Sequence, residues 1–331
     1  MRSSHVGSFP LEHSLQNVGR ILKDLATLGI DVPPYPQMRG FIDIYVSPLM
    51  EVGVVSLTEG FLRTDVNALA SQDLRSLCVP EAELAVRTVK ESGLKFKGLR
   101  APVTGVFTLA SRIYLRAGTT DLSSTALSSK DLLKGFFTEY VSRYVSYMSS
   151  IGFDLVFIDE PTLGLMVGAR RNLFNYRDED LIEVLEMVAR AAGAAEVGVH
   201  VCGRIHRRIL ELLTQVKKIK YLSFEFHDNP GNVEVIDRHL LETNDKIISP
   251  GIVSSRRPIL ESESEVLDLL KRIYEKAGGR VDLVCGDCGF AGLRGSLANR
   301  EEEYRLALSK LGRVVRAVKS FCQAGLDILG S

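Results

Sequence analysis

A histidine and a cysteine, His200 and Cys202, stand two residues apart in an apolar run, residues 196–203, that is typical of a β-strand. Side chains alternate across a strand, so these two point to the same side of it. Imidazole and thiolate are both ligands for zinc, which also accepts carboxylates and prefers a tetrahedral set of four. The pair therefore predicts half of a metal site.

Polar residues end other apolar runs in the same half of the chain. Glu225 lies near the end of residues 220–228, and Cys285 and Cys288 lie near the end of residues 280–289. The four residues that would supply a zinc set from three strand ends are His200, Cys202, Glu225 and Cys288. Two alternatives stay open: Cys285 and Cys288 form a redox pair, or both bind metal and leave Glu225 out. A buried cysteine can also simply pack as a small apolar side chain.

Further acidic residues follow these runs. Asp159 and Glu160 end the run 153–161 and could act in chemistry or only mark the start of a helix. We expect His227 and Asp228 to face solvent or to cap the helix that follows them.

Elements that would position these residues alternate regularly along the chain. The predicted strands are residues 98–107, 153–161, 196–203, 220–228, 246–255 and 280–289, and the predicted helices are 11–29, 81–93, 132–152, 178–194, 204–216, 233–244, 264–278 and 300–322. Strand–helix units in series predict parallel strands joined by right-handed crossovers. The expected fold is an α/β (β/α)₈ TIM barrel, a single domain over residues 1–331, with the site at the carboxyl ends of its strands. A doubly wound sheet is the alternative, although no GxGxxG or P-loop follows a strand.

Composition narrows the partners. The 331 residues include 41 Lys and Arg against 41 Asp and Glu, and 45% are hydrophobic. Balanced charge without basic blocks argues against a nucleic-acid partner. The sequence has no signal-peptide pattern and no apolar run of about 18 residues, so we expect a cytoplasmic protein with no membrane partner. Five scattered cysteines argue against a disulfide framework.

Seven motifs, in order, resemble the carboxyl-terminal catalytic barrel of cobalamin-independent methionine synthase. They are HVGSFP (5–10), APVTG (101–105), IDEPTLG (158–164), HVC (200–202), SFEF (223–226), SRR (255–257) and GDCGFAGLR (286–294). The resemblance covers nearly the whole chain. It implies a short form of the family, without the amino-terminal domain.

The resemblance also implies the activity and the site. Methionine would be made by methyl transfer to homocysteine at a zinc ion, and we expect no catalytic residue apart from the zinc ligands and the substrate-binding residues. Homocysteine would place its carboxylate near the Val6, Gly7 and Ser8 loop and its amino group near Glu59 and Asp159. A loop with free N–H groups suits a carboxylate, and acids suit an ammonium group. The implied zinc ligands are His200, Cys202, Glu225 and Cys288.

Three departures from the family concern the methyl donor. The sequence has no tryptophan, and the positions that contact or protonate the pterin in folate-using members align with Arg112, Leu165 and Ser254. A pterin nitrogen is a poor leaving group that needs protonation by a general acid. A reduced cobalt centre is a stable leaving group and needs no general acid. We therefore expect a methylated corrinoid as donor, methylcobalamin or a corrinoid protein, with methylfolate (5-methyltetrahydropteroyl-glutamate) as the second choice. The rival functions are a zinc enzyme that methylates another thiol and a non-catalytic zinc-binding barrel.

Overall fold

A computed structural model of the chain describes residues 1–66, 69, 77–116 and 118–329. Its centre is a five-stranded sheet in which every neighbouring pair is parallel, so the predicted α/β class with parallel strands is confirmed. In sheet order the strands are β3 (Arg100–Thr104), β5 (Leu155–Asp159), β6 (Glu196–Val201), β7 (Tyr221–Glu225) and β8 (Ile247–Gly251).

Three further segments continue this sheet through isolated parallel bridges. Residues 281–285 pair with β8, and Ser3 pairs with Val284 of that segment. Residues 4–8 pair in turn with residues 32–37, where Pro34 bridges to Arg100 at the start of β3. The bridges therefore lead from β8, at one edge of the sheet, back to β3 at the other.

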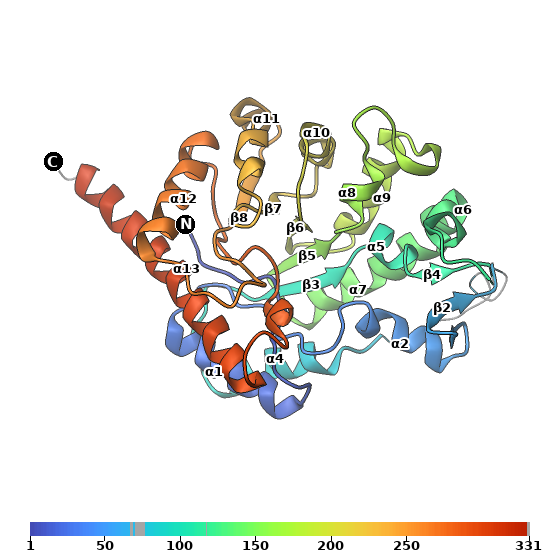
Figure 1. Cartoon of the computed structure of the whole chain (residues 1–331), viewed down its shortest axis with the longest axis horizontal. Coiled ribbons are helices and arrows are strands. Elements are labelled where there is room, and N and C mark those ends of the chain that lie inside the picture. The colour runs from blue at the N-terminus through green and yellow to red at the C-terminus, as the bar shows by residue number, and fades with distance from the viewer. Residues whose placement is uncertain (67–68, 70–76, 117, 330–331) are drawn as a thin grey trace.

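Helices follow these segments and surround them (Figure 1). These helices are α1 (Leu15–Leu28), α4 (Pro80–Glu91), α7 (Thr138–Ile151), α9 (Asp178–Arg190), α10 (Arg207–Gln215), α11 (Arg238–Thr243), α12 (Glu263–Lys276) and α13 (Arg300–Leu329). Contacts join α1 to α4 and α13, α7 to α4 and α9, and α10 to α9 and α11. The predicted helix 233–244 is divided into a 3₁₀ segment, η5 (Pro230–Val235), and α11, because Asp237 is extended and caps Leu240.

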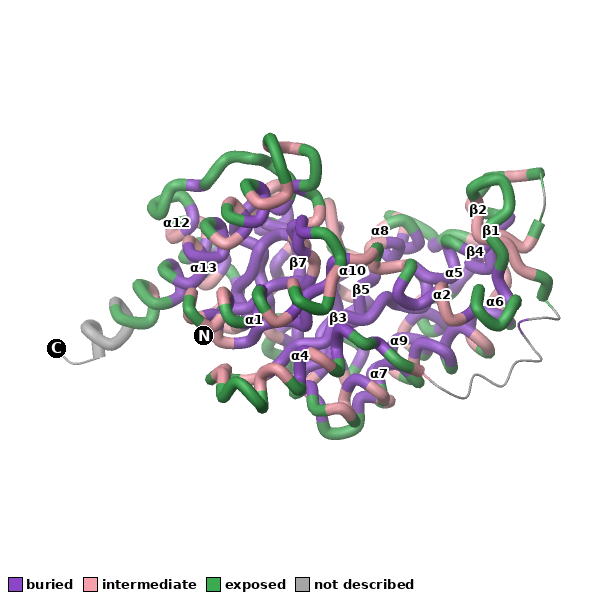
Figure 2. The backbone as a smooth tube through the Cα atoms, turned by 90° about the horizontal axis from the view of Figure 1, so that it is seen from below, coloured by how far each residue is buried: buried purple, intermediate pink, exposed green. Residues whose placement is uncertain are grey.

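A second, three-stranded sheet was not expected from the sequence. It contains β1 (Val55–Thr58), β2 (Phe61–Thr64) and β4 (Ile113–Tyr114), in that order. Figures 1 and 2 show it at the end of the molecule opposite the carboxyl end of α13. The other described helices are α2 (Asp43–Glu51), α5 (Val106–Ala110), α6 (Lys130–Leu132), α8 (Leu163–Met166), η1 (Leu122–Ser124), η2 (Ala126–Ser128), the π-helical η3 (Leu133–Phe137), η4 (Leu173–Asn175) and η6 (Phe290–Leu293).

The strands of the central sheet are buried on both faces (Figure 2). One face packs under the helices, and the other meets a small apolar cluster that includes Leu155, Phe157 and Tyr221. Gly198 of β6 makes room there, because a Cβ atom at this position would collide with the Phe157 ring. None of the helices in the described ranges is both long enough and apolar enough to span a bilayer.

Candidate metal centre

Three of the expected metal ligands converge in the structure. His200 is the second-last residue of β6, Cys202 follows the strand on the same side of the chain, and Cys288 comes from the segment after residues 281–285. The His200 Nε2 atom lies 3.0 Å from Cys202 Sγ, and the two sulfur atoms lie 3.4 Å apart. All three candidate ligand atoms lie within 4.8 Å of one another. Cys285 is not part of this group.

Contacts around the ligand atoms favour thiolate and an oriented imidazole. The His200 Nδ1 atom lies 3.1 Å from the Ser223 hydroxyl on β7, which fixes the ring and leaves Nε2 toward the sulfurs. The pKa of the Cys288 thiol lies well below its ordinary value, because it accepts hydrogen bonds from Cys202 and His200. The same contact raises the pKa of Cys202. These contacts therefore favour the thiolate form of Cys288, the form in which a cysteine binds a metal.

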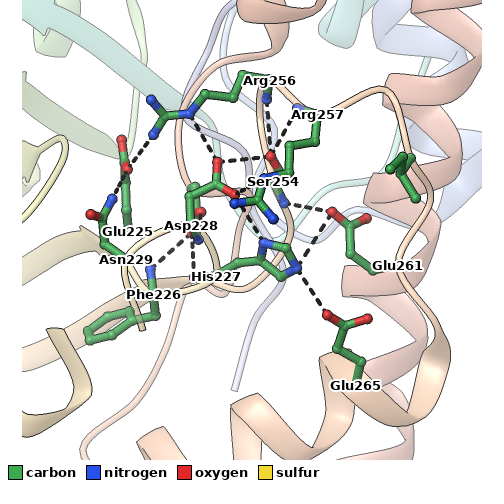
Figure 3. A network of polar contacts seen from close by, with 12 residues as sticks. Glu225, Phe226, His227, Asp228, Asn229, Ser254, Arg256, Arg257, Glu261 and Glu265 are labelled. Carbon is green, nitrogen blue, oxygen red and sulfur yellow. Dashed lines mark hydrogen bonds and ion pairs between the residues drawn. The ribbon is translucent and has the colours of Figure 1, made fainter. Parts of the chain in front are cut away.

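Glu225, the fourth expected ligand, ends β7 but is held by other side chains (Figure 3). Its Oε2 atom accepts hydrogen bonds from Asn229 Nδ2 at 2.6 Å and Arg256 Nη2 at 2.8 Å. Glu225 is buried, and it is not in the group formed by His200, Cys202 and Cys288. To join them, its carboxylate would have to use its other oxygen or give up these two bonds.

The residues that hold Glu225 belong to a larger network (Figure 3). Asp228 accepts from Ser254 Oγ at 2.9 Å and from Arg256 Nε at 3.0 Å, and it pairs with Arg257. The His227 ring lies between Asp228 on one side and two carboxylates on the other, Glu261 just before α12 and Glu265 in its first turn. The expectation that His227 and Asp228 face solvent or cap a helix is wrong, because these arginines and acids cover them.

Asp287 ties this network to the cysteine loop. It is fully buried, and its carboxylate accepts backbone hydrogen bonds from Phe226, His227 and Asp228 at 2.6 to 3.0 Å. Burial raises its pKa to about 7. Asp287 therefore fixes the loop after Glu225 against the loop that carries Cys288.

Asp159 and Glu160 have different surroundings. Asp159 pairs in register with His200, and its Oδ1 atom has no hydrogen-bond partner among the described residues. Burial raises its pKa to about 7. Glu160 accepts from the backbone N–H groups of Phe107 and Thr108, so it caps the start of α5 and serves the fold. Of these two acids, Asp159 is the one with an oxygen that lacks a hydrogen-bond partner among the described residues.

The loop of Val6, Gly7 and Ser8 lies next to the cysteine loop. The Ser8 hydroxyl accepts from the Ala291 N–H at 3.1 Å, and a Cβ atom on Gly289 would collide with Ser8. Within the described part of the chain, no hydrogen bond engages the backbone N–H groups of Val6, Gly7 and Ser8. These groups are the kind of donors that a carboxylate needs.

The structure does not join Glu59 to these residues by any described contact. It lies in the turn between β1 and β2, its side chain is 76% exposed, and it pairs with Arg63. The positions expected to differ from folate-using members have different surroundings. Arg112 is exposed and Leu165 is 66% exposed, whereas Ser254 is buried and donates a hydrogen bond to Asp228.

Chemically, two thiols and an imidazole suit zinc better than calcium or magnesium, which prefer oxygen ligands. With zinc–sulfur bonds of about 2.3 Å, tetrahedral sulfur ligands lie about 3.8 Å apart. The 3.4 Å separation of Cys202 and Cys288 is therefore a few tenths of an ångström short of that spacing. The residues fit a zinc ion after a small widening.

Sequence reasoning missed the residues that act behind the ligands. Asn229 and Arg256 bind Glu225, Ser223 orients His200, and Gln37 lies beside Gly7. A serine or asparagine of this kind carries no pattern of its own, because its role depends on which strand ends lie next to each other.

Comparisons with known proteins bear on the family and the fold. The sequence profile of the family "Cobalamin-independent synthase, Catalytic domain" matches residues 140–312, more than half of the chain. No curated protein matches the sequence. A solved B12-independent methionine synthase from Shewanella sp. W3-18-1, in complex with selenomethionine, is 15% identical with a TM-score of 0.69 over 98% of this chain and 99% of that one. A methyltransferase from Methanosarcina mazei is 17% identical with a TM-score of 0.63 over 93% and 86%.

The two structures, at these identities, speak for the fold, whereas the profile speaks for the family. The profile spans Asp159, His200, Cys202, Glu225 and Cys288. The chain belongs to the family of cobalamin-independent synthase catalytic domains.

Proposed function

We propose that this protein is a zinc-dependent methyltransferase that makes methionine by transferring a methyl group to the thiol of homocysteine. The observation that carries the proposal is the convergence of His200, Cys202 and Cys288, with Ser223 behind the histidine. Zinc held there would lower the pKa of a coordinated thiol and so supply a thiolate nucleophile at neutral pH. Glu225 would be the fourth ligand, turned toward or away from the other three by Arg256 and Asn229.

The remaining residues would bind the amino-acid part of the substrate. The free N–H groups of Val6, Gly7 and Ser8 would receive its carboxylate, and the unpartnered oxygen of Asp159 would receive its ammonium group. Glu59 would help only if the β1–β2 hairpin closed over the site. The buried Gln37 offers a neutral amide oxygen beside Gly7 instead.

We infer further that the chain is one (β/α)₈ barrel over residues 1–331. The parallel bridges that lead from β8 through residues 281–285, 3–8 and 32–37 back to β3 support closure. In such a barrel the carboxyl ends of the strands share one rim, as the proposed site requires.

The proposed donor is a methylated corrinoid, either methylcobalamin or a corrinoid protein. The lack of tryptophan, the exposed Arg112 and Leu165, and the buried Ser254 together leave no aromatic platform or acid for a pterin at the aligned positions. Transfer from a methyl–cobalt bond needs no proton at the leaving group.

A zinc enzyme that methylates another thiol is the second candidate. It is favoured by the position of Glu59, because Asp159 is then the only expected acid beside the cluster to recognise an ammonium group. Replacing Asp159 with asparagine should reduce the preference for homocysteine over simple thiols, and an unchanged preference would support this second candidate.

The test is methionine formation by the zinc-loaded protein from homocysteine, with methylcobalamin in one reaction and methyltetrahydrofolate in another. We expect product with methylcobalamin alone. Cys288→Ser should abolish it, whereas the matched control Cys322→Ser changes an exposed thiol on α13 and should leave it intact. Product with the folate alone would refute the proposed donor, and no product from any thiol would refute the transferase.

A further inference from the structure

Arg100 is a buried cation whose guanidinium group forms no hydrogen bond with the described residues. It starts β3, its backbone bonds to Pro33 and Tyr35 hold it in place, and its side chain has no exposed surface. None of its three guanidinium nitrogens has a hydrogen-bond partner among the described residues. The guanidinium carbon lies 3.5 Å from the centre of the Phe157 ring, within the apolar cluster inside the sheet.

Such a charge is costly where it lies. Burial lowers the pKa of Arg100, yet an arginine stays protonated in proteins. The cation–π contact with the Phe157 ring offsets part of the hydration free energy that the guanidinium loses on burial. An uncompensated buried charge is strongly destabilising, so the fold would keep this one only if a negative charge nearby offsets it.

The other buried cations of the described chain show the contrast. The Lys246 ammonium donates to the carbonyls of Val216 and Ile219, and the Lys310 ammonium donates to Glu261 at 2.7 Å. Both find their acceptors directly. Arg100 does not.

The group that acts most strongly on Arg100 is the thiol of Cys285, which is buried three residues before Cys288. Asp159, which pairs in register with His200, and Cys288 act on it as well, and Arg100 in turn acts on His200. These last contacts link Arg100 to the candidate metal centre. Two thiolates and the Glu225 carboxylate carry three negative charges, and a zinc ion carries two positive ones. With a neutral histidine the ligand set keeps one net negative charge, and a substrate thiolate would add another.

We propose that Arg100 is the counter-cation of the metal centre, a positioning residue that offsets the negative charge of its thiolate ligands from inside the sheet. The inference rests on the proposed function, since it needs a metal held by Cys202 and Cys288. Arg100 touches neither metal nor substrate. Its contribution is a fixed charge in a site where water cannot screen it.

The test compares wild type with Arg100→Met in two conditions, chelated and zinc-loaded. The zinc dissociation constant is measured by competition with a chelating dye, and the unfolding midpoint is measured in both conditions. Removing the charge should weaken zinc binding by roughly 10- to 100-fold, as losses of outer-shell partners do. The chelated variant should unfold at the same midpoint as wild type or at a higher one, because it has lost an unpaired buried charge.

Two further variants keep the result interpretable. Arg100→Lys retains the charge and should restore most of the zinc affinity. Arg100→Gln removes the charge without adding an apolar group, and it gives the same comparison if methionine prevents folding. The matched control Lys246→Met removes a buried cation that has its own acceptors, so it should destabilise the protein in both conditions and leave the zinc affinity unchanged.

Equal zinc affinity in wild type, Arg100→Met and Arg100→Gln would overturn the inference. A loss of stability without zinc, at unchanged affinity, would also overturn it and would assign Arg100 to Cys285 or to buried water. If wild type itself binds no zinc, the proposed function fails first, and this outcome is distinguishable because it appears before any variant is made.

Discussion

Asp287 offers the sharpest test of how the site is held, because one carboxylate anchors three backbone groups. Its Oδ1 atom accepts from Phe226 and His227, each at 3.0 Å, and its Oδ2 atom accepts from Asp228 at 2.6 Å. Asp287→Asn has nearly the same shape but turns one acceptor into a donor. Asp287→Ala removes all three acceptors.

The expected cost follows from counting the backbone donors left unpaired. A buried donor without an acceptor costs about 1–3 kcal/mol, so Asp287→Asn should lower the free energy of unfolding by about that amount. Asp287→Ala leaves three such donors and should cost at least about 3 kcal/mol, less than a full sum because the loop can relax. The zinc affinity should fall as well, because the same contacts hold the loop after Glu225 against the residue before Cys288.

Urea unfolding of the chelated protein measures the first effect, and dye competition for zinc measures the second. Asp268→Asn on α12 is the matched control, since its carboxylate is exposed and pairs only weakly with Lys271. The reasoning is refuted if Asp287→Ala is as stable as wild type, or if the asparagine and alanine variants cost the same. Unchanged zinc affinity in a destabilised alanine variant would show that the two loops do not position the ligands.

Three further predictions concern single positions. Burial raises the pKa of Asp159 to about 7, so its carboxylate loses its charge as the pH falls through 7, and homocysteine binding should weaken by up to about tenfold more per pH unit below 7 in wild type than in Asp159→Asn. Calorimetry over pH measures both slopes, and equal slopes in the two proteins would contradict this role of Asp159. Gly198→Ala should destabilise the protein by about 1–3 kcal/mol, because the new methyl group meets the Phe157 ring; an unchanged urea midpoint would contradict the packing. Arg256→Gln should change zinc affinity by freeing Glu225, while Arg257→Gln, a neighbour that pairs only with Asp228, should not; equal effects in both variants would mean that Arg256 acts only through general charge.

The convergence of His200, Cys202 and Cys288 could be predicted because strand geometry makes their positions explicit. His200 and Cys202 follow the alternation of a strand. Cys288 follows residues 281–285, which pair in parallel with β8, so this segment ends on the same side of the sheet as β6. The state of Glu225 could not be predicted in the same way. Its hydrogen bonds come from Asn229 and Arg256, which lie on loops with no periodic pattern.

The segments that lead from β8 back to β3 had weak sequence signals for physical reasons. Residues 32–37 contain three prolines, which cannot donate to a sheet, so only isolated bridges form there. Leu283 has a φ of 53°, which interrupts the expected strand 280–289. The β1–β2 turn has φ values of 54° at Glu59 and 81° at Gly60, a conformation usually marked by Asn-Gly, so the hairpin was not recognised.

X-ray absorption of the zinc-loaded protein, with and without homocysteine, tests the central claim most directly. The ligands Cys202 and Cys288 predict two sulfur atoms around zinc in the resting protein, and a third when the thiol of homocysteine joins them. A zinc ion with no sulfur ligands, or a sulfur count that homocysteine leaves unchanged, would contradict the proposed thiol activation.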